Sequence, residues 1–331
     1  MSVRGLLVRI LSFTSGVLGC LFAEAEKDIK MSEFSDFKTL KDFGYEFNPA
    51  GELKQIESGE PFKFEVKPGD KNYNQQHYEA LGEVLNLEVY RLLEEKAGLK
   101  KLYLNQELDS FIFVSKDYAK KDKLLLLIHG SGVVRAGQWA RRLIINNDLD
   151  KGTQLPYIEF ALKEGFGVIV LNTNQNTYLK DEKELQIPES SSPEEHASTV
   201  WNRFVRPANA DDVVIVAHSY GGVVALNLAT DMMQEFMNRV SGVLLTDSVH
   251  HGLTGKNVLD TKLRKISKNY VASSKPVGET VYKSKSDILA VSAGHEKHEW
   301  TSWSAMLNIF QDIRNIFQEP DQTQTKDQTE L

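Results

Sequence analysis

The chain has 331 residues, of which 41% are hydrophobic and 26% are charged, and this composition excludes disorder throughout the chain. Its 39 Lys and Arg against 46 Asp and Glu give a formal charge of −7, which argues against a protein that holds nucleic acid mainly by neutralising phosphates. The single cysteine, Cys20, excludes an intramolecular disulfide, a Cys-ligated structural zinc site and a Cys-based redox pair. We expect no cofactor and no metal site.

The two ends of the chain differ from its middle. Arg4 and Arg9 precede a largely apolar run, Ile10–Phe22, and Ala23-Glu24-Ala25 follows it. Residues 1–25 are therefore typical of a secretory signal peptide, and a disordered N-terminus is the alternative. The run is shorter than the roughly 20 residues that cross a bilayer, so we expect no membrane span. Residues 319–331 predict a disordered tail, because they contain almost no apolar side chains.

The folded region opens with a predicted hairpin and a long helix. Two short β-rich runs, Tyr45–Asn48 and Glu52–Ile56, flank Pro49-Ala50-Gly51, which indicates strands joined by a turn. Residues 73–97 then place apolar side chains at helical spacing, and Gly98 stands where a helix C-terminal cap is expected.

Seven apolar or β-rich runs after this helix predict strands. They are Lys101–Leu104, Ser110–Val114, Leu124–Ile128, Gly167–Leu171, Val213–Ala217, Val240–Thr246 and Ile288–Val291. From the third onward, the runs are separated by segments long enough for helices; one helix starts at Pro193, where Ser192 and Glu195 predict a capping box. The alternation predicts an α/β fold, with a mostly parallel sheet and helices on both faces. With no repeat and no Pro/Gly-rich linker, residues 26–318 are expected to form one domain.

The most informative stretch is the end of the strand Val213–Ala217. Ser219 follows it at once, and a helix is expected from there through Met237. This is the context of a nucleophile elbow, a strained strand-to-helix turn that needs small residues two positions before and after the serine. Ala217 and Gly221 meet that need, although the first of these positions is more often Gly. Ser219 is therefore the candidate nucleophile.

An acyl-transfer serine also needs N–H groups directed at the developing oxyanion. The loop His129-Gly130-Ser131-Gly132 after the strand Leu124–Ile128 is placed to supply them, together with the N–H of the residue after the serine. We therefore predict an oxyanion site made by Gly130, Ser131 and Tyr220. A plain glycine-rich turn is the alternative.

The base and its orienting acid are expected later in the chain, at the ends of strands. Asp247 ends the strand Val240–Thr246, and His298 follows the strand Ile288–Val291. The predicted catalytic set is Ser219, Asp247 and His298. His295 is the rival base, because it is nearer the strand end. His218 is expected to pack or hydrogen-bond under the elbow, since adjacent residues at that turn point apart.

Several of these stretches resemble the Argonaute-binding-protein-two family, and within it the animal cotranscriptional regulators. The most specific is the run His129–Asn146, which reads HGSGVVRAGQWARRLIIN. Others are Ser192–Ala197, Ala217–Gly222, Leu245–His250, and Val291–Gly294 with His298-Glu299. The resemblance covers nearly all of residues 34–317. It implies an α/β-hydrolase-like domain used in gene regulation, a role in alternative splicing, Argonaute and chromatin or splicing partners, and residence in nucleus and cytoplasm.

Two departures from that family change the expectations. Between Asn176 and Pro188 the chain has a short connection where longer relatives carry a Lys/Arg-rich insertion, so a nuclear-import and nucleic-acid patch is expected to be missing. The last residues match an ER-retrieval signal only in part. Use of the signal-like segment would still place the protein in the ER or outside the cell. The remaining basic cluster is most simply a solvated helix face; it consists of Lys262, Arg264, Lys265 and Lys268.

Two hypotheses of function follow, and they can hold together. The first is a regulatory scaffold that keeps the hydrolase-like fold and uses its surface for partners. The second is a serine hydrolase acting on a small ester, thioester or amide. The segments expected to line the substrate pocket, Asn174–Ser191 and His251–Lys285, are predicted as loops without a recognisable signature.

Overall fold

The computed structural model describes residues 32–253, 257–282 and 287–318. The signal-like segment, Cys20 and the predicted tail lie outside these residues. The described residues divide into two compact units, one made of residues 32–48 and 53–88, the other of residues 49–52 and the described residues from 89 to 318. The single domain expected over 26–318 stays a prediction.

The first unit contains the predicted hairpin and most of the predicted long helix. Strands β1 (Tyr45–Phe47) and β2 (Leu53–Gln55) pair antiparallel, and the helix α2 runs over Lys71–Glu95. Two short 3₁₀ turns precede the hairpin, η1 (Ser32–Phe34) and η2 (Leu40–Phe43). Aromatic rings form the centre of this unit, since Phe34 contacts the rings of its neighbours in η2 and α2. Packed rings of this kind supply a large buried apolar area.

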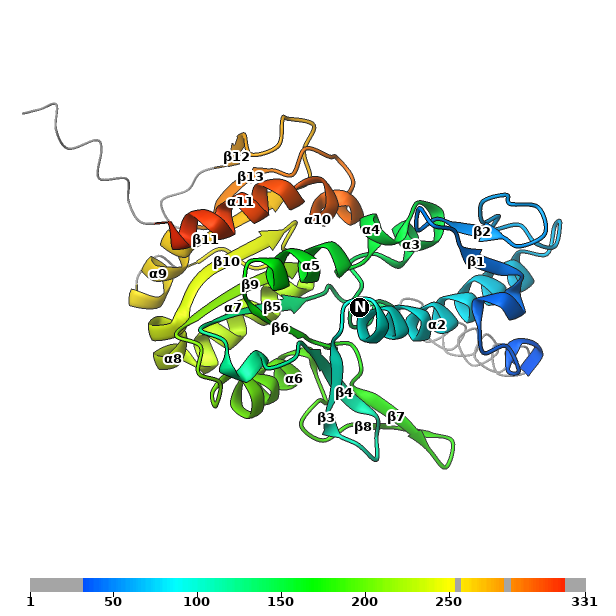
Figure 1. Cartoon of the computed structure of the whole chain (residues 1–331), viewed down its shortest axis with the longest axis horizontal. Coiled ribbons are helices and arrows are strands. Elements are labelled where there is room, and N and C mark those ends of the chain that lie inside the picture. The colour runs from blue at the N-terminus through cyan, green and yellow to red at the C-terminus, as the bar shows by residue number, and fades with distance from the viewer. Residues whose placement is uncertain (1–31, 254–256, 283–286, 319–331) are drawn as a thin grey trace, which may run out of the picture. The chain divides into compact units, whose positions relative to one another are not determined.

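A nine-stranded sheet forms the centre of the second unit, counted over the residues that the structure describes. Its order is β12-β13-β11-β10-β9-β5-β6-β4-β3, as Figure 1 shows. Only β4 and β12 run antiparallel to the rest. This is an α/β-hydrolase-like arrangement, so the predicted fold class is confirmed. The bounds are β3 Lys100–Asn105, β4 Ser110–Val114, β5 Lys123–Ile128, β6 Gly167–Val170, β9 Asp212–His218, β10 Val240–Thr246, β11 Ser267–Val271, β12 Thr280–Tyr282 and β13 Leu289–Ser292.

Helices cover both faces of this sheet. On one face α5 and α11 pack together, with the rings of Phe160 and Phe310 stacked at 3.9 Å, while α6 to α9 share a buried apolar cluster with the strands on the other (Figure 1). No helix in the described ranges is both long and apolar enough to cross a bilayer. The helices are α3 Arg141–Asn146, α4 Leu149–Gly152, α5 Leu155–Lys163, α6 Pro193–Val200, α7 Tyr220–Asp231, α8 Met233–Arg239, α9 Val258–Ile266, α10 Thr301–Ser304 and α11 Met306–Phe317; the short turns are η3 Tyr118–Lys120, the π-helical η4 Trp201–Val205 and η5 His298–Trp300.

All seven predicted strands are present, but the expected loops contain further elements. The segment Asn174–Ser191 holds a hairpin of β7 (Thr177–Lys180) and β8 (Lys183–Gln186), and His251–Lys285 holds α9, β11 and β12. Strand β11 reads Ser-Lys-Asn-Tyr-Val and lacks an apolar run. Its polar side chains are satisfied inside the fold, because Lys268 pairs with Asp312 and Asn269 accepts from the Ser248 N–H.

Three local predictions need correction. The helix after Ser219 does not run unbroken through Met237, because α7 and α8 meet at Met232. The capping box at α6 is half formed: Ser192 accepts from the Glu195 N–H, but the Glu195 carboxylate accepts from the Ser191 N–H, at 2.8 Å. The basic cluster is not one helix face, because Lys268 lies in β11.

Candidate active site

Ser219 stands at a strained turn between β9 and α7. Its backbone has φ 53° and ψ −120°, a conformation that non-glycine residues rarely adopt. A Cβ added to Gly221 would lie 2.6 Å from the carbonyl oxygens of both Ile128 and His129, so the turn approaches β5 too closely for a side chain there. The Ser219 N–H donates to Thr246 O at 2.9 Å, which ties the turn to the end of β10. The local geometry is that of a nucleophile elbow.

The glycine-rich loop after β5 lies against this serine. A Cβ built on Gly130 would be 3.0 Å from the Ser219 Cβ. Tyr220 is the first residue of α7, where an N–H has no partner within its helix. Ser131 is exposed. Gly130 and Tyr220 therefore lie next to Ser219, and the role of these two residues and of Ser131 as donors stays a prediction.

Asn174 fixes the conformation of this loop. Its amide group donates to Gly130 O at 2.9 Å and to Val134 O at 3.0 Å, two carbonyl groups of the same turn. Asn174 was not among the residues predicted from the sequence. The available signal was its place shortly after β6, at the carboxyl end of a parallel strand, where polar residues gather around a site.

Asp247 and His298 are hydrogen-bonded, with Nδ1 and Oδ2 2.6 Å apart. Burial alone would raise the pKa of Asp247, but hydrogen bonds from His298 and the Ala272 N–H lower it below the ordinary value. The hydrogen bond to Asp247 raises the pKa of His298. An ionised carboxylate only accepts, so Nδ1 carries the proton and Nε2 of the neutral ring is left to accept another.

The structure pairs His298 with Asp247, and it places His295 elsewhere. His295 stacks on Trp300 at 4.9 Å, and its Nδ1 accepts from the Lys297 N–H. Among the described residues, no hydrogen bond joins the Ser219 hydroxyl to His298. Such bonds are often long in a free enzyme and tighten when substrate binds.

His218 lies beneath the site. Its side chain is buried, and its Nδ1 is 3.0 Å from Thr246 O. Its ring faces that of His298, with centroids 4.7 Å apart. Burial, and next the nearby His298, lower the pKa of His218 to about 3, so it stays neutral. This agrees with the expected packing role under the elbow.

Two other histidines, His129 and His196, are also buried. Burial lowers the pKa of His129 to about 4 and that of His196 to about 3. His196 is satisfied, because it accepts from the Asn172 N–H and bonds Ser190 Oγ at 2.9 Å. Among residues 32–253, 257–282 and 287–318, no group of three His, Cys, Asp or Glu side chains is placed to hold a metal ion.

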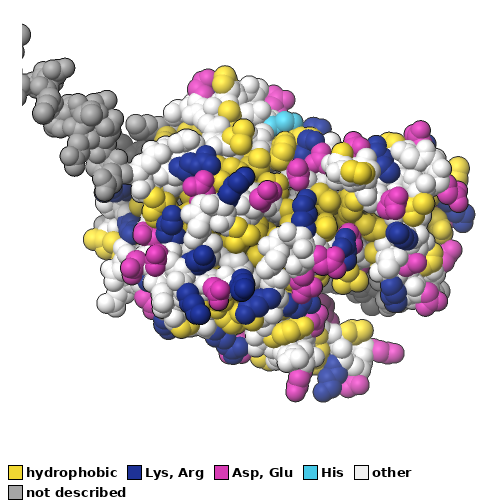
Figure 2. Space-filling view, in the orientation of Figure 1, with side chains coloured by type: hydrophobic (Ala, Val, Ile, Leu, Met, Phe, Trp, Pro, Cys, Tyr) yellow, Lys and Arg dark blue, Asp and Glu magenta, His cyan; other side chains and the backbone are white. Residues whose placement is uncertain are grey.

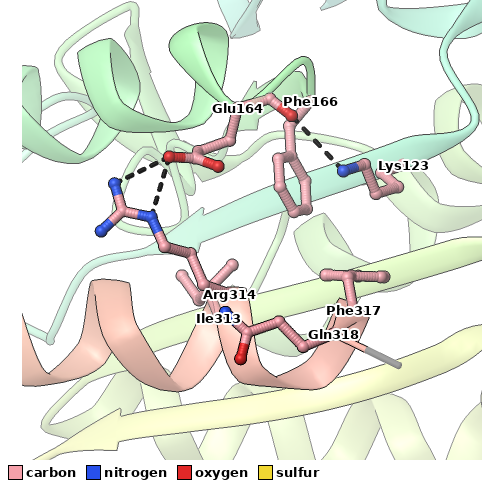
Figure 3. A pocket seen from close by; sticks show the side chains of 7 residues that line it. All are labelled: Lys123, Glu164, Phe166, Ile313, Arg314, Phe317 and Gln318. Carbon is pink, nitrogen blue, oxygen red and sulfur yellow. Dashed lines mark hydrogen bonds and ion pairs between the residues drawn. The ribbon is translucent and has the colours of Figure 1, made fainter. Parts of the chain in front are cut away.

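A separate cavity of about 260 Å³ lies at the opposite, amino end of the strands (Figure 3). Lys123, the first residue of β5, reaches over the rings of Phe166 and Phe317, at 4.7 and 4.9 Å from their centroids. Arg314 pairs with Glu164 at 2.7 Å beside it. The cations in this cavity already have partners, and none of the predicted site residues lines it.

The sequence comparison decides the family. Residues 37–277, well over half of the chain, match the Arb2 domain. The chain belongs to the Arb2 domain family. This Arb2 protein is 41% identical to the cotranscriptional regulator ARB2A homolog of Gallus gallus and 40% identical to cotranscriptional regulator ARB2A of Homo sapiens, in each case over 86% of this chain and 82% of the relative. The family resemblance predicted from His129–Asn146 is therefore confirmed.

Among solved structures, the histone deacetylase Clr3 is similar to this Arb2 protein with a TM-score of 0.49 and 16% identity, over 78% of this chain and 41% of that one. The Arb2 domain match includes Ser219 and Asp247 and ends before His298. The acid and the histidine that it contacts thus come from inside and outside the matched segment. Only the folded chain brings them together.

Proposed function

We propose that this Arb2 protein is a cotranscriptional regulator, acting in alternative splicing through Argonaute and chromatin or splicing partners in the nucleus. The supporting observation is the 40–41% identity, over most of both chains, to proteins named as cotranscriptional regulators. A mixed-sign surface is compatible with protein partners: in Figure 2 basic and acidic side chains are interspersed over the face in view, with no broad field of one sign. Such a face gives little of the phosphate neutralisation that nucleic-acid binding requires.

The test is capture of Argonaute from animal cells that express the tagged protein. The parent and Ser219→Ala are expected to capture equal amounts, because the substitution removes one oxygen from a partly buried residue and leaves the rest of the surface unchanged. Val214→Asp is the matched loss control, since Val214 is fully buried in β9 and an unpaired charge there unfolds the sheet. If the folded parent captures no Argonaute above background, the Argonaute part of the proposal is wrong. Unchanged splicing after depletion of the protein would contradict the rest.

The second candidate function is serine hydrolysis of a small acyl substrate, and the bond between His298 and Asp247 favours it. In this mechanism Ser219 Oγ attacks the acyl carbon while Nε2 of His298 takes its proton. Asp247 holds the ring in the required tautomer and stabilises the imidazolium. The N–H groups of Tyr220 and the Gly130-Ser131 turn receive the oxyanion. His298 then protonates the leaving group, and water repeats the steps to release the acid.

A fluorophosphonate probe tests this chemistry without a known substrate. The parent is expected to form an adduct at Ser219, and Ser219→Ala should lose that adduct while it keeps its thermal midpoint. His298→Ala should lose it too, whereas His295→Ala, the matched control, should retain most of it. Undiminished labelling of Ser219 in His298→Ala would remove His298 from the mechanism. If the folded parent does not label at Ser219, the hydrolase proposal is wrong and only the regulator proposal remains.

A further inference from the structure

A second serine, histidine and aspartate are connected beside the candidate site. Ser248 Oγ lies 2.7 Å from Nδ1 of His250, and Nε2 of His250 lies 3.7 Å from Oδ1 of Asp287. The His250 side chain is 6% exposed and that of Asp287 is 29% exposed. None of the three belongs to the predicted catalytic set, and no role was predicted for any of them from the sequence. The imidazole thus has a hydroxyl within hydrogen-bond distance of Nδ1 and a carboxylate near Nε2, at a distance longer than a hydrogen bond.

The protonation state of His250 follows from its surroundings. Burial lowers the pKa of His250, with a smaller opposing effect of Asp287, so the ring is kept neutral. The nearby carboxylate favours a proton on Nε2, which leaves the lone pair of Nδ1 facing Ser248. The Ile288 N–H donates to Oδ1 of Asp287 at 2.8 Å and holds that carboxylate in place. The Ser248 hydroxyl therefore has a proton acceptor that is already oriented.

Ser248 also lies over the first turn of α7. A Cβ added to Gly222 would be 2.0 Å from Ser248 Oγ, so the hydroxyl occupies the space that a side chain would take at the third residue of this helix. The backbone around it is fixed, because the Ser248 N–H donates to Asn269 and the Val249 N–H to Ser219 O. α7 has 12 residues, and the positive end of its dipole stabilises negative charge on a nearby oxygen. The dipole of α7 and the imidazole of His250 thus both act on Ser248 Oγ.

We propose that Ser248 is a second nucleophile, activated by His250 and Asp287, that accepts an acyl or phosphonyl group from an activated donor. A bond forms between Ser248 Oγ and the electrophilic carbon or phosphorus, and the bond to the leaving group breaks. The serine proton passes to Nδ1 of His250, which later returns it to the leaving group. The two serines then share the amino end of α7, each with its own base. This activity does not depend on turnover at Ser219.

Adduct mapping with a fluorophosphonate probe separates the two serines. Trypsin cleaves after Arg239, so Ser219 falls in the peptide 204–239 and Ser248 in the peptide 240–256. In full-length Ser219→Ala, the 240–256 peptide is expected to gain the probe mass at Ser248. Ser219→Ala combined with Ser248→Ala should give no adduct on that peptide. Because each peptide is read separately, failure at Ser219 and failure at Ser248 are distinguishable.

Rates in the Ser219→Ala background test the activation. Asp287→Asn and His250→Gln should each slow the Ser248 adduct by roughly 10²-fold or more, the range of general base catalysis. His251→Gln is the matched control, because the neighbouring His251 is exposed. Ser248 in this variant should label at the same rate as in Ser219→Ala alone. If His250→Gln does not fold, the labelling rate of Asp287→Asn decides the question, because Asp287 is partly exposed and its substitution should leave the fold intact. Absence of a Ser248 adduct in folded Ser219→Ala, or an unchanged rate in Asp287→Asn, would overturn the proposal.

Discussion

The two ends of the central sheet differ in how their residues are held. At the carboxyl ends, Ser219 and Asp247 follow β9 and β10 with φ of 53° and 45°, and Gly221 lies against two carbonyl oxygens. At the amino ends, the cavity of Figure 3 is lined by a half-exposed ion pair and a lysine over two rings. Strain persists only where the surroundings impose it. The carboxyl ends of the strands are therefore constrained and carry the candidate catalytic side chains, whereas the amino ends carry ordinary surface contacts.

The largest expected effect at the constrained end comes from Asp247→Asn. The substitution keeps the size of the side chain but removes the charge that orients His298 and stabilises its imidazolium, so labelling of Ser219 should slow by roughly 10³- to 10⁴-fold. Stopped-time probe labelling, with adducts counted on the 204–239 peptide, measures it. A rate within a factor of ten of the parent would mean that the 2.6 Å bond to His298 has no catalytic role.

The second effect concerns the close approach at the elbow. Gly221→Ala places a Cβ 2.6 Å from two backbone oxygens that cannot move easily, and should destabilise the fold by about 1–3 kcal/mol, the usual cost of overpacking. Urea unfolding measures it. Asn227→Ala, an exposed position of the same helix, is the control and should change stability little. Equal midpoints for the two variants would show that the turn relaxes freely.

The third effect is the pH dependence of labelling. The base must be neutral, so labelling of Ser219 should rise with pH and reach half its maximum above 6.5, because Asp247 raises the pKa of His298. In Asp247→Asn the midpoint should move to lower pH. Because the pKa of His298 is higher in the folded than in the unfolded protein, His298 stabilises the fold fully at pH values below its unfolded pKa. This stabilisation is lost as the pH rises through the folded pKa. A pH-independent rate would exclude His298 as the base.

The smallest effect is expected at the amino end. Arg314→Ala removes a pair with Glu164 in which both side chains are about a third exposed or more, so it should cost about 1 kcal/mol or less. Labelling of Ser219 should not change. Thermal unfolding and the probe assay check both statements. A tenfold loss of labelling would show that the two ends of the sheet are coupled, contrary to this prediction.

The sequence predicted the central strands and the elbow, for reasons that are local. Apolar runs such as Leu124–Ile128 and Val213–Ala217 identify buried parallel strands, because both faces of such strands are covered. The elbow could be predicted because its steric demands fall on residues two positions from the serine. Strand β11 could not, since its pairing between β10 and β13 is made by partners distant in the chain.

The contacts of the site needed the tertiary structure. His295 and His298 are three residues apart, and although the sequence favoured His298, only the folded turn places its ring against Asp247 and that of His295 against Trp300. Asp287 likewise meets Ser248 and His250, which are two residues apart in the sequence, only in the folded chain. The sequence by itself determined the seven strands that have apolar or β-rich runs and the position of the strained serine, because periodicity and side-chain size act over a few residues. The tertiary structure decided which polar groups become partners, because hydrogen bonds depend on distances of a few ångströms between segments that the chain keeps far apart.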